Sequence, residues 1–383
     1  MKIFLTFFPL SENEHLAKDV GIIPNILARE YGYDSYLAVY DMGQNFEHLN
    51  SIAKNLKIWY IKCPKKPKFS RISLQSILFF IKNARKIDVV NFYHLSKETK
   101  ILSVIYKFFN RRGLVYIKGD VNIAFEQSVK KEKSFTFKNI PYFILKALFK
   151  NTLNLISVER HRSMDIFKAN FPEYKGKIFH LPNGIDLNFL RSIGFEQPKK
   201  ADKEKIIITV GRIGIIEKNN EMMLEALNGL DLKDWKFVFI GQIYDETNIK
   251  PKIEQFYLDN PNLKDKVVFA GNIIDRAELY NYYKKAAFFC LTSISESWCI
   301  ALSDTLYFGC EIISTNVGCF DDITKNDFGY EIKNTNELRG IFERIMNNQI
   351  DPLQNFDKII ERSKEFDWHY LCEKLHKMLQ ERI

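Results

Sequence analysis

At 383 residues the chain is too long for one ordinary domain and long enough for two. Its content of 46% hydrophobic and 27% charged residues is that of a soluble globular protein. No apolar run reaches the roughly 18–20 residues that a membrane-spanning helix needs. Six cysteines without a CxxC pair argue against a disulfide framework or a zinc knuckle and favour a reducing cytoplasm.

The net charge of +9 is distributed unevenly along the chain. Residues 1–190 carry 30 Lys and Arg against 16 Asp and Glu, whereas residues 191–383 carry 26 against 31. A basic half indicates an anionic partner such as a nucleic acid, an anionic lipid or a phosphorylated acceptor. A solubilising surface is the alternative explanation.

Short apolar runs alternate with helical patterns from the N-terminus onward. Such alternation predicts a parallel sheet with helices on both faces, whose ligands lie beyond the carboxyl ends of the strands. We expect the loops at 9–15, 93–97 and 118–122 to lie at that edge. The predicted strands are 2–8, 35–39, 57–61, 88–92 and 114–117, and the predicted helices are 16–30, 46–55, 74–86 and 100–109.

Residues 130–153 have a different character. Apolar residues at helical spacing, with Lys138, Lys146 and Lys150 beside them and aromatic residues from Phe135 to Phe149, predict a basic, aromatic helix of the interfacial kind. A buried domain helix is the alternative. The Pro- and Lys-rich loop at 63–71 would extend the same basic, apolar face.

A strong turn at Asn183-Gly184 marks the expected domain boundary. We predict an N-terminal domain over 1–188 and a C-terminal domain over 189–367, with a charged linker at 197–205. An amphipathic helix over 361–383 is expected, and its residues 368–383 would pack back on the first domain. The strands expected in the second domain are 206–210, 236–240, 266–269, 287–291 and 311–314, and the helices are 219–229, 253–258 and 276–285.

Two carboxylates, Glu296 and Asp304, lie eight residues apart where a strand passes through a polar loop into a helix. They suit a sugar hydroxyl at one end and a second hydroxylated ligand at the other. After the strand at 206–210, Gly211 permits a close turn, Arg212 offers a bidentate phosphate fork and Lys218 supplies a second positive charge. The absence of GxxxxGK[ST] argues against a P-loop.

These features, taken together and in order, resemble the family-4 retaining glycosyltransferases of GT-B architecture. The match runs from about residue 180 to residue 330 and thins out toward the N-terminus. The resemblance implies an α/β fold of two Rossmann-like, doubly wound domains facing across a cleft, the first binding the acceptor and the second a nucleotide-sugar. It rests on Pro182-Asn183-Gly184-Ile185-Asp186, Val210-Gly211-Arg212 with Lys218-Asn219, Glu296 with Asp304, and Gly318 with Asp322 and Gly329.

The resemblance also implies roles for individual residues. Arg212 and Lys218 would bind the pyrophosphate of the donor, Glu296 would accept hydrogen bonds from the sugar hydroxyls, and Asp304 would hold the ribose. The N–H groups at the start of a helix would face the phosphate. Those N–H groups belong to Ser297, Trp298, Cys299 and Ile300, and Gly241, Asn272 and Ile273 would lie near the base.

The chain departs from the family pattern in several places. Asp304 stands where Glu is usual and is one methylene shorter, and Cys319 replaces a frequent Gly. Residues 11–14 stand where a Gly pair is usual. The loop 297–300 is bulkier than usual, so that it would restrict the donor sugar or alter the packing.

For the residue that assists the acceptor we expect Asp120 first and His94 second, in an orienting role, because the leaving phosphate would take the proton. A turn-forming Asp120 and a structural His94 are the alternatives.

The sequence therefore predicts a hexosyltransferase for bacterial cell-surface glycans such as capsule or lipopolysaccharide. It would use a UDP-linked donor and a lipid-linked or polysaccharide acceptor, without metal, cofactor or nucleic acid. The predicted location is the inner face of the cytoplasmic membrane, with peripheral contact to anionic lipid. Asp321-Asp322 is interpreted as a structural cap. A sugar-nucleotide epimerase and a non-catalytic sugar-binding protein of the same architecture are the alternatives.

Overall fold

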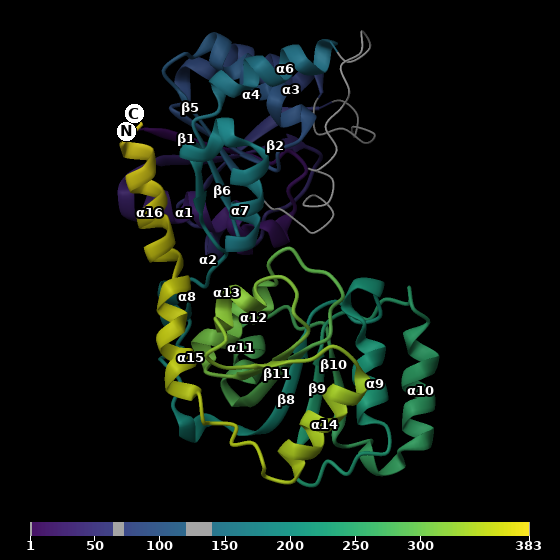
Figure 1. The fold of residues 1–383 in the computed structure, drawn as a ribbon. Helices are drawn as coiled ribbons and strands as arrows, with labels where there is room; N and C mark the ends of the chain where they lie inside the picture. The colour runs from purple at the N-terminus through teal and green to yellow at the C-terminus, as the bar shows by residue number, and fades with distance from the viewer. Residues whose placement is uncertain (1, 64–72, 120–139, 383) are drawn as a thin grey trace. The chain divides into compact units, whose positions relative to one another are not determined.

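The computed structural model describes residues 2–63, 73–119 and 140–382, and the chain forms two compact units (Figure 1). Unit 1 comprises Met1–Asp186 together with Trp368–Ile383, and unit 2 comprises Leu187–Asp367. The boundary therefore lies two residues before the position expected from the sequence. Within the described residues, none of the helices is both long and apolar enough to span a bilayer.

Unit 1 is built on a parallel sheet of seven strands in the order β3-β2-β1-β4-β5-β6-β7. The central strands β4 and β5 are buried along their whole length. Near-continuous apolar runs are expected in strands that helices cover on both faces. The strands are β1 (Ile3–Phe7), β2 (Asp34–Asp41), β3 (Lys57–Lys62), β4 (Val89–Tyr93), β5 (Leu114–Gly119), β6 (Leu155–Val158) and β7 (Ile178–His180).

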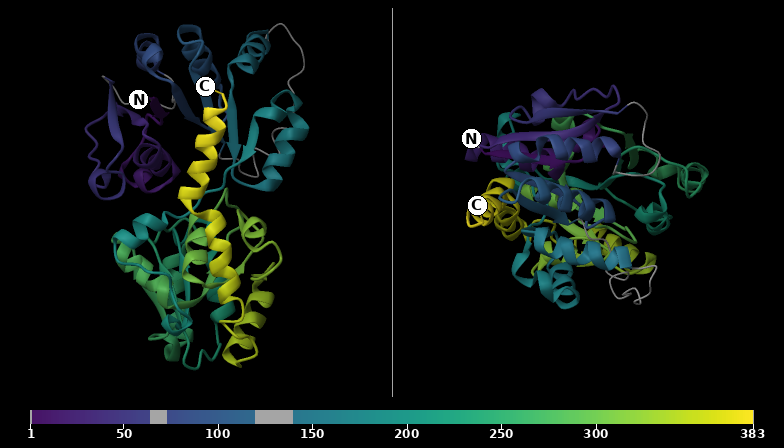
Figure 2. Two further views of the ribbon diagram at one scale, coloured as in Figure 1. Left: turned by 90° about the vertical axis from the view of Figure 1, so that its left-hand side faces the viewer. Right: turned by 90° about the horizontal axis from the view of Figure 1, so that it is seen from above.

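Two groups of helices cover the faces of this sheet (Figure 2). On one face α1 (Asp19–Tyr31) packs beside the C-terminal helix α16 (Trp368–Gln380). On the other face lie α3 (Leu74–Asn83), α4 (Lys97–Phe109) and α6 (Ile140–Thr152). Helix α7 (His161–Asn170) adds Phe167 to the core on this second face, and Leu49 of α2 (Leu49–Ile52) packs with Val20 of α1 and Leu37 of β2.

Unit 2 is built on a second parallel sheet, in the order β10-β9-β8-β11-β12-β13. Helices α9, α10 and α14 pack on one face, and α11 and α12 cover the other. The strands are β8 (Glu204–Val210), β9 (Lys236–Ile240), β10 (Val267–Gly271), β11 (Ala286–Leu291), β12 (Glu311–Ser314) and β13 (Tyr330–Glu331). The helices are α8 (Leu187–Ser192), α9 (Asn220–Leu227), α10 (Ile249–Asp259), α11 (Arg276–Lys285), α12 (Ile300–Phe308), α13 (Phe320–Thr324), α14 (Thr335–Met346) and α15 (Phe356–Ser363).

Two doubly wound parallel sheets with interleaved helices confirm the predicted fold class. The prediction of one helix over 361–383 is wrong. Helix α15 ends at Ser363, a 3-10 turn follows, and Asp367 is extended before α16 begins. The chain leaves unit 2 at this break, and the backbone N–H of Trp368 donates to the carbonyl of Ile185 in unit 1, at 3.0 Å.

Helix α16 supplies a large part of the apolar layer over α1, so its packing can be tested by truncating one side chain. Leu375 is fully buried, and we expect Leu375→Ala to destabilise unit 1 by about 2–4 kcal/mol through lost burial and a residual cavity. Tyr370, on the exposed side of the same helix, is the matched control, and Tyr370→Ala should cost less than about 1 kcal/mol. Urea unfolding measures both, and equal midpoints for the two variants would contradict the docking of α16.

Candidate nucleotide-binding site

The strand order of unit 2 reverses between β8 and β11. In open parallel sheets, ligands bind at such a switch point, beyond the carboxyl ends of the strands. The loops after β8 and β11 hold Arg212, Lys218 and Glu296, and the loops after β9 and β10 hold the remaining predicted positions at the same edge. Those positions are Gly241, Asn272 and Ile273.

An ion pair joins the two loops at the switch point. The ammonium Nζ of Lys218 lies 2.5 Å from Oε1 of Glu296, and the hydroxyl of Ser293 donates to the same oxygen at 2.7 Å. Both charged side chains are 15% exposed. The sequence predicted each residue at the site, and the fold brings them into direct contact across 78 residues of chain.

Backbone contacts fix the two loops around this pair. The N–H of Ile294 donates to the carbonyl of Glu217 at 2.8 Å. The hydroxyl of Thr292 donates to the carbonyls of Lys218 and Asn219, at 3.1 and 2.9 Å. The loop after β8 is therefore held by the loop after β11, which positions the Lys218 side chain before any ligand arrives.

The electrostatics of the pair keep Lys218 charged. Burial lowers the pKa of the Lys218 ammonium, but Cys299 and the hydrogen-bonded Glu296 raise it by more, so that the pKa stands above its ordinary value. Arg212 acts in the opposite direction on the same pKa, which puts its positive charge within electrostatic range of Lys218. The site thus presents two cations, Lys218 and Arg212, and Arg212 is exposed to solvent.

Two glycines allow neighbouring loops to close on this edge. Gly241 has φ 148°, and a Cβ there would lie 1.8 Å from the carbonyl oxygen of Gly211. Gly318 has φ 58°, and a Cβ there would lie 2.7 Å from the carbonyl oxygen of Trp298 and 2.9 Å from Cβ of Glu296. Larger residues would displace the backbone beside the ion pair at both positions.

Residues 297–299 form the bulky loop before α12, and its largest side chain, Trp298, faces the interior of unit 2. Trp298 is 2% exposed, its indole N–H donates to the hydroxyl of Ser303 at 2.7 Å, and its ring packs near Phe366. The Trp298 side chain therefore packs inside unit 2, behind the loop, and its expected influence on the donor sugar stays a prediction. Cys299 is the N-cap of α12 in a left-handed conformation, φ 74°, and the first N–H groups of a helix have no partner within it.

Asp304 lies inside α12 and is 5% exposed. Burial raises the pKa of its carboxyl to about 7, and the nearby Arg276 guanidinium opposes that rise. Only a small part of the carboxyl is accessible to a ligand, and its role toward ribose stays a prediction.

The predicted residues of unit 1 are only partly described. His94 follows β4 in a left-handed conformation, and its N–H donates to the carbonyl of Lys118 at 3.1 Å. Asp120 lies outside the described residues, as do Phe135, Lys138 and residues 64–72. The roles of Asp120 and His94 stay predictions.

A buried ion pair at the carboxyl edge of the sheet in unit 1 was not predicted from the sequence. Lys118 is fully buried at the end of β5, and its Nζ lies 2.7 Å from Oε1 of Glu159, which follows β6. The amide of Asn183 donates to the same carboxylate oxygen at 2.8 Å, and Asp19 lies 3.7 Å from the ammonium. A lysine directly after an apolar strand was the available signal, because such a position is buried in a parallel sheet.

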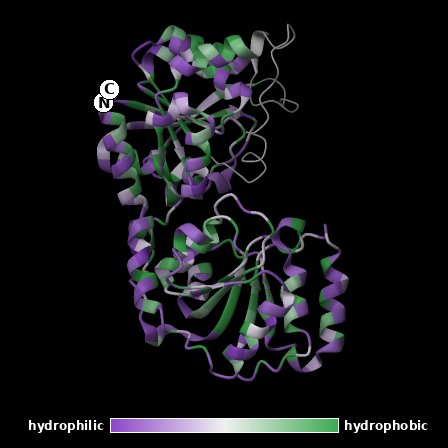
Figure 3. Ribbon diagram, in the orientation of Figure 1, coloured by the Kyte–Doolittle hydropathy of each residue, from purple (hydrophilic) through white to green (hydrophobic). Residues whose placement is uncertain are grey.

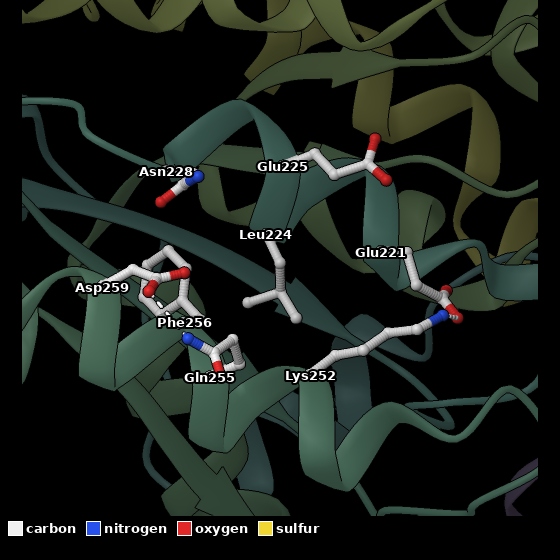
Figure 4. A pocket seen from close by; sticks show the side chains of 8 residues that line it. All are labelled: Glu221, Leu224, Glu225, Asn228, Lys252, Gln255, Phe256 and Asp259. Atoms are coloured by element: carbon white, nitrogen blue, oxygen red, sulfur yellow. Dashed lines mark hydrogen bonds and ion pairs between the residues drawn. The ribbon is translucent and has the colours of Figure 1, made fainter.

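A groove of about 240 Å³ lies elsewhere in unit 2, between α9 and α10 (Figure 4). Leu224 and Phe256 form its apolar part, and Lys252 bridges to Glu221 at 3.3 Å. None of the residues predicted for the donor lines this groove. Its remaining lining residues are Glu225, Asn228, Gln255 and Asp259.

The raised pKa of Asp304 predicts a pH dependence of stability. The folded chain keeps the Asp304 proton from about pH 4 to about pH 7, where the unfolded chain has lost it, so the free energy of unfolding falls as the pH rises through this window. Asp304→Asn should remove that fall and be more stable than the wild type at pH 8 by on the order of a few kcal/mol. Urea unfolding at several pH values measures this. The control, Asp357→Asn on an exposed carboxylate, should keep the wild-type slope, and a wild-type slope in Asp304→Asn would refute the expectation.

Comparison with known proteins relates unit 2 to one family profile. Residues 191–365 match the family profile described as "Glycosyl transferases group 1". One similar protein, from Campylobacter jejuni, is named N-acetylgalactosamine-N,N'-diacetylbacillosaminyl-diphospho-undecaprenol 4-alpha-N-acetylgalactosaminyltransferase. It is 23% identical over 321 residues, which cover 81% of this chain and 83% of that protein.

A second protein of Campylobacter jejuni is named GalNAc-alpha-(1->4)-GalNAc-alpha-(1->3)-diNAcBac-PP-undecaprenol alpha-1,4-N-acetyl-D-galactosaminyltransferase. It is 29% identical over 189 residues, covering 47% of this chain and 49% of that protein, so this match spans about half of its length. Among solved structures, Anabaena Alr3699/HepE in complex with UDP covers 100% of both chains at 13% identity with a TM-score of 0.69, which shows a common fold. Residues 191–365 are therefore similar to the glycosyl transferases group 1 family, and the chain shares the fold of its two doubly wound units with the solved structure.

Proposed function

We propose that the protein transfers a hexosyl group from a UDP-sugar to a lipid-linked acceptor in cell-surface glycan synthesis, with retention of configuration. The observation that carries the proposal is the Lys218–Glu296 pair at the switch point of unit 2, beside Arg212 and the N-terminus of α12. The names of the Campylobacter relatives, which include diphospho-undecaprenol acceptors, and the UDP in the Anabaena structure support the choice of substrates.

Donor binding would exchange the contacts of the ion pair. Diphosphate oxygens take the ammonium of Lys218 and the guanidinium of Arg212, and a hydroxyl of the donor sugar donates to Glu296. Each charged group thereby keeps a charge-assisted hydrogen bond when the donor occupies this edge of the sheet. The segment that leads into α12, residues 297–300, would add N–H groups to the phosphate. Asp304 is the proposed ribose ligand, and Gly241, Asn272 and Ile273 would lie on the base side.

The proposed reaction breaks the bond between the anomeric carbon and the β-phosphate oxygen. The acceptor hydroxyl attacks the anomeric carbon on the same face, its proton passes to a phosphate oxygen, and UDP leaves. Lys218 and Arg212 stabilise the charge that develops on the diphosphate, which is the role a metal ion plays elsewhere. A metal-independent reaction is therefore part of the proposal, with the Lys218 ammonium protonated at neutral pH.

Unit 1 would receive the acceptor, with Asp120 and His94 as the residues that orient it. A lipid-linked acceptor brings the enzyme to the inner face of the cytoplasmic membrane as a peripheral protein. The excess of basic residues in 1–190 suits the phosphates of such an acceptor and of anionic lipid.

Removing either partner of the ion pair tests the catalytic assignment. We expect Lys218→Met and Glu296→Gln to lower kcat/KM for sugar transfer by about 100-fold or more, because a preorganised charge at the diphosphate or the sugar is lost. The control is Lys205→Met, which removes an exposed ammonium that pairs with Asp234 in the same unit. Release of UDP during transfer measures the rate. Wild-type rates in both site variants would refute the assignment.

A nucleotide panel tests the donor and the reaction type. UDP should raise the melting temperature of the full chain more than ADP, GDP or CDP does, because a ligand of the folded state stabilises it by mass action. With a UDP-sugar and a lipid diphosphate saccharide, the product should form in the presence of EDTA, and NMR should show the anomeric configuration of the donor. Release of an isomerised sugar would indicate the epimerase, and nucleotide binding without any product would indicate a sugar-binding protein.

A further inference from the structure

Three neighbouring helices of unit 1 expose apolar side chains to solvent. Helix α4 packs against both α3 and α6, so the three form one layer, and Figure 3 shows hydrophobic turns along them. Six of the fifteen exposed large hydrophobic side chains in the described part of the chain lie on this layer. They are Leu74, Leu78 and Ile81 on α3, Phe108 on α4, and Ile144 and Leu148 on α6, each between 40% and 76% exposed.

The apolar stripe on α3 is separate from the side that packs on the sheet. Leu74, Leu78 and Ile81 follow one another at helical spacing and therefore share one side of the helix. Phe79 and Phe80 point to the opposite side and are buried in the core of the unit. The core is thus complete without the exposed stripe, which is available to an apolar partner.

Helices α6 and α4 repeat this arrangement. On α6, Phe149 is buried in the same core, whereas Ile144 and Leu148 are exposed on the other side. On α4, Phe108 is 76% exposed, and Tyr106 is buried. Exposed apolar side chains gathered on adjoining helices mark an interaction surface, whereas scattered single ones do not.

Lysines crowd around the same layer. Burial lowers the pKa of Lys100 on α4, and the positive charge of Lys146 on α6 lowers it further. Burial and the charge of Lys177 likewise lower the pKa of Lys107 on α4, and Lys150 acts on Lys177. Lys82 on α3 and Lys150 on α6 are exposed on the same layer, and an anionic surface would attract their charges.

We propose that the α3–α4–α6 layer docks on the surface of an anionic lipid bilayer, with its six exposed apolar side chains in the acyl boundary and its lysines at the lipid phosphates. Apolar area together with basic residues is the combination that binds proteins peripherally to anionic membranes. The sequence indicated the α6 segment and the loop at 63–71, most of which lies outside the described residues, and the fold adds α3 and α4. The proposal rests on the proposed function for its biological reason, a lipid-linked acceptor, but its test does not use the transfer reaction.

Sedimentation of the full chain with vesicles tests the apolar part. The vesicles are equal parts phosphatidylcholine and phosphatidylglycerol. We expect the triple variant Leu74→Gln, Leu78→Gln, Ile81→Gln to bind at least about tenfold more weakly than the wild type. The control is the double variant Leu258→Gln, Ile274→Gln, which changes side chains of unit 2 that are even more exposed and should bind as the wild type does.

The charged part is tested by reversing exposed lysines of the layer. Lys82→Glu with Lys150→Glu should weaken binding to the anionic vesicles, and binding of the wild type should fall with added salt and be weak on pure phosphatidylcholine. Unchanged melting temperatures in all variants show that they are folded.

Two results would overturn the proposal. One is wild-type vesicle binding by the triple Gln variant. The other is a wild-type dimer in size-exclusion chromatography that the same variant converts to a monomer without a change in vesicle binding, which would make the layer an interface between copies of the chain. The UDP-induced rise in melting temperature is read separately in each variant. A wild type that binds vesicles but not UDP would count against the proposed function and leave membrane docking supported.

Discussion

The ion pair between Lys218 and Glu296 holds together the two loops on which the candidate donor site is built. It depends on the doubly wound sheet, because β8 and β11 are neighbours only where the strand order reverses. Desolvating two charges offsets much of their attraction, so such a pair contributes more to positioning than to stability. Partial exposure leaves both charged groups within reach of a ligand that can form a hydrogen bond to each of them. Gly318 allows the loop after β12 to lie against the backbone of Trp298 and the side chain of Glu296.

Unit 1 has a comparable pair, and the difference in burial separates the two roles. Lys118 and Glu159 meet at the carboxyl edge of the sheet, with 0% and 4% of their side chains exposed. The same carboxylate binds the amide of Asn183, so the pair also holds the turn that precedes the boundary between the units. A pair closed in this way fixes the loop and has no free face for a substrate, whereas the pair in unit 2 does.

The sequence predicted the strands well where a strand is a short apolar run with turn residues around it, as in β4 and β11. The resemblance to the glycosyltransferase family supplied the candidate donor residues, whose roles stay predictions. The fold brings the loops that carry most of them to one edge, because the carboxyl ends of parallel strands share it. It did not predict contacts that need the strand order, such as Lys118 with Glu159, 41 residues apart. It also missed β13, which has two residues, and left open whether Trp298 points inward, because neither feature leaves a periodic pattern.

The exposed layer of α3, α4 and α6 shows why periodicity alone was insufficient. When a helix has apolar residues on two sides, only one side packs on the sheet. The sequence does not show which of the two sides stays exposed to solvent. Phe79 and Phe80 take the sheet side of α3, so the stripe of Leu74, Leu78 and Ile81 remains in water. Side chains that stay exposed on folding add little to the stability of the unit, and their burial can be favourable only against another apolar phase. The neighbouring lysines make an anionic bilayer the phase that suits this surface.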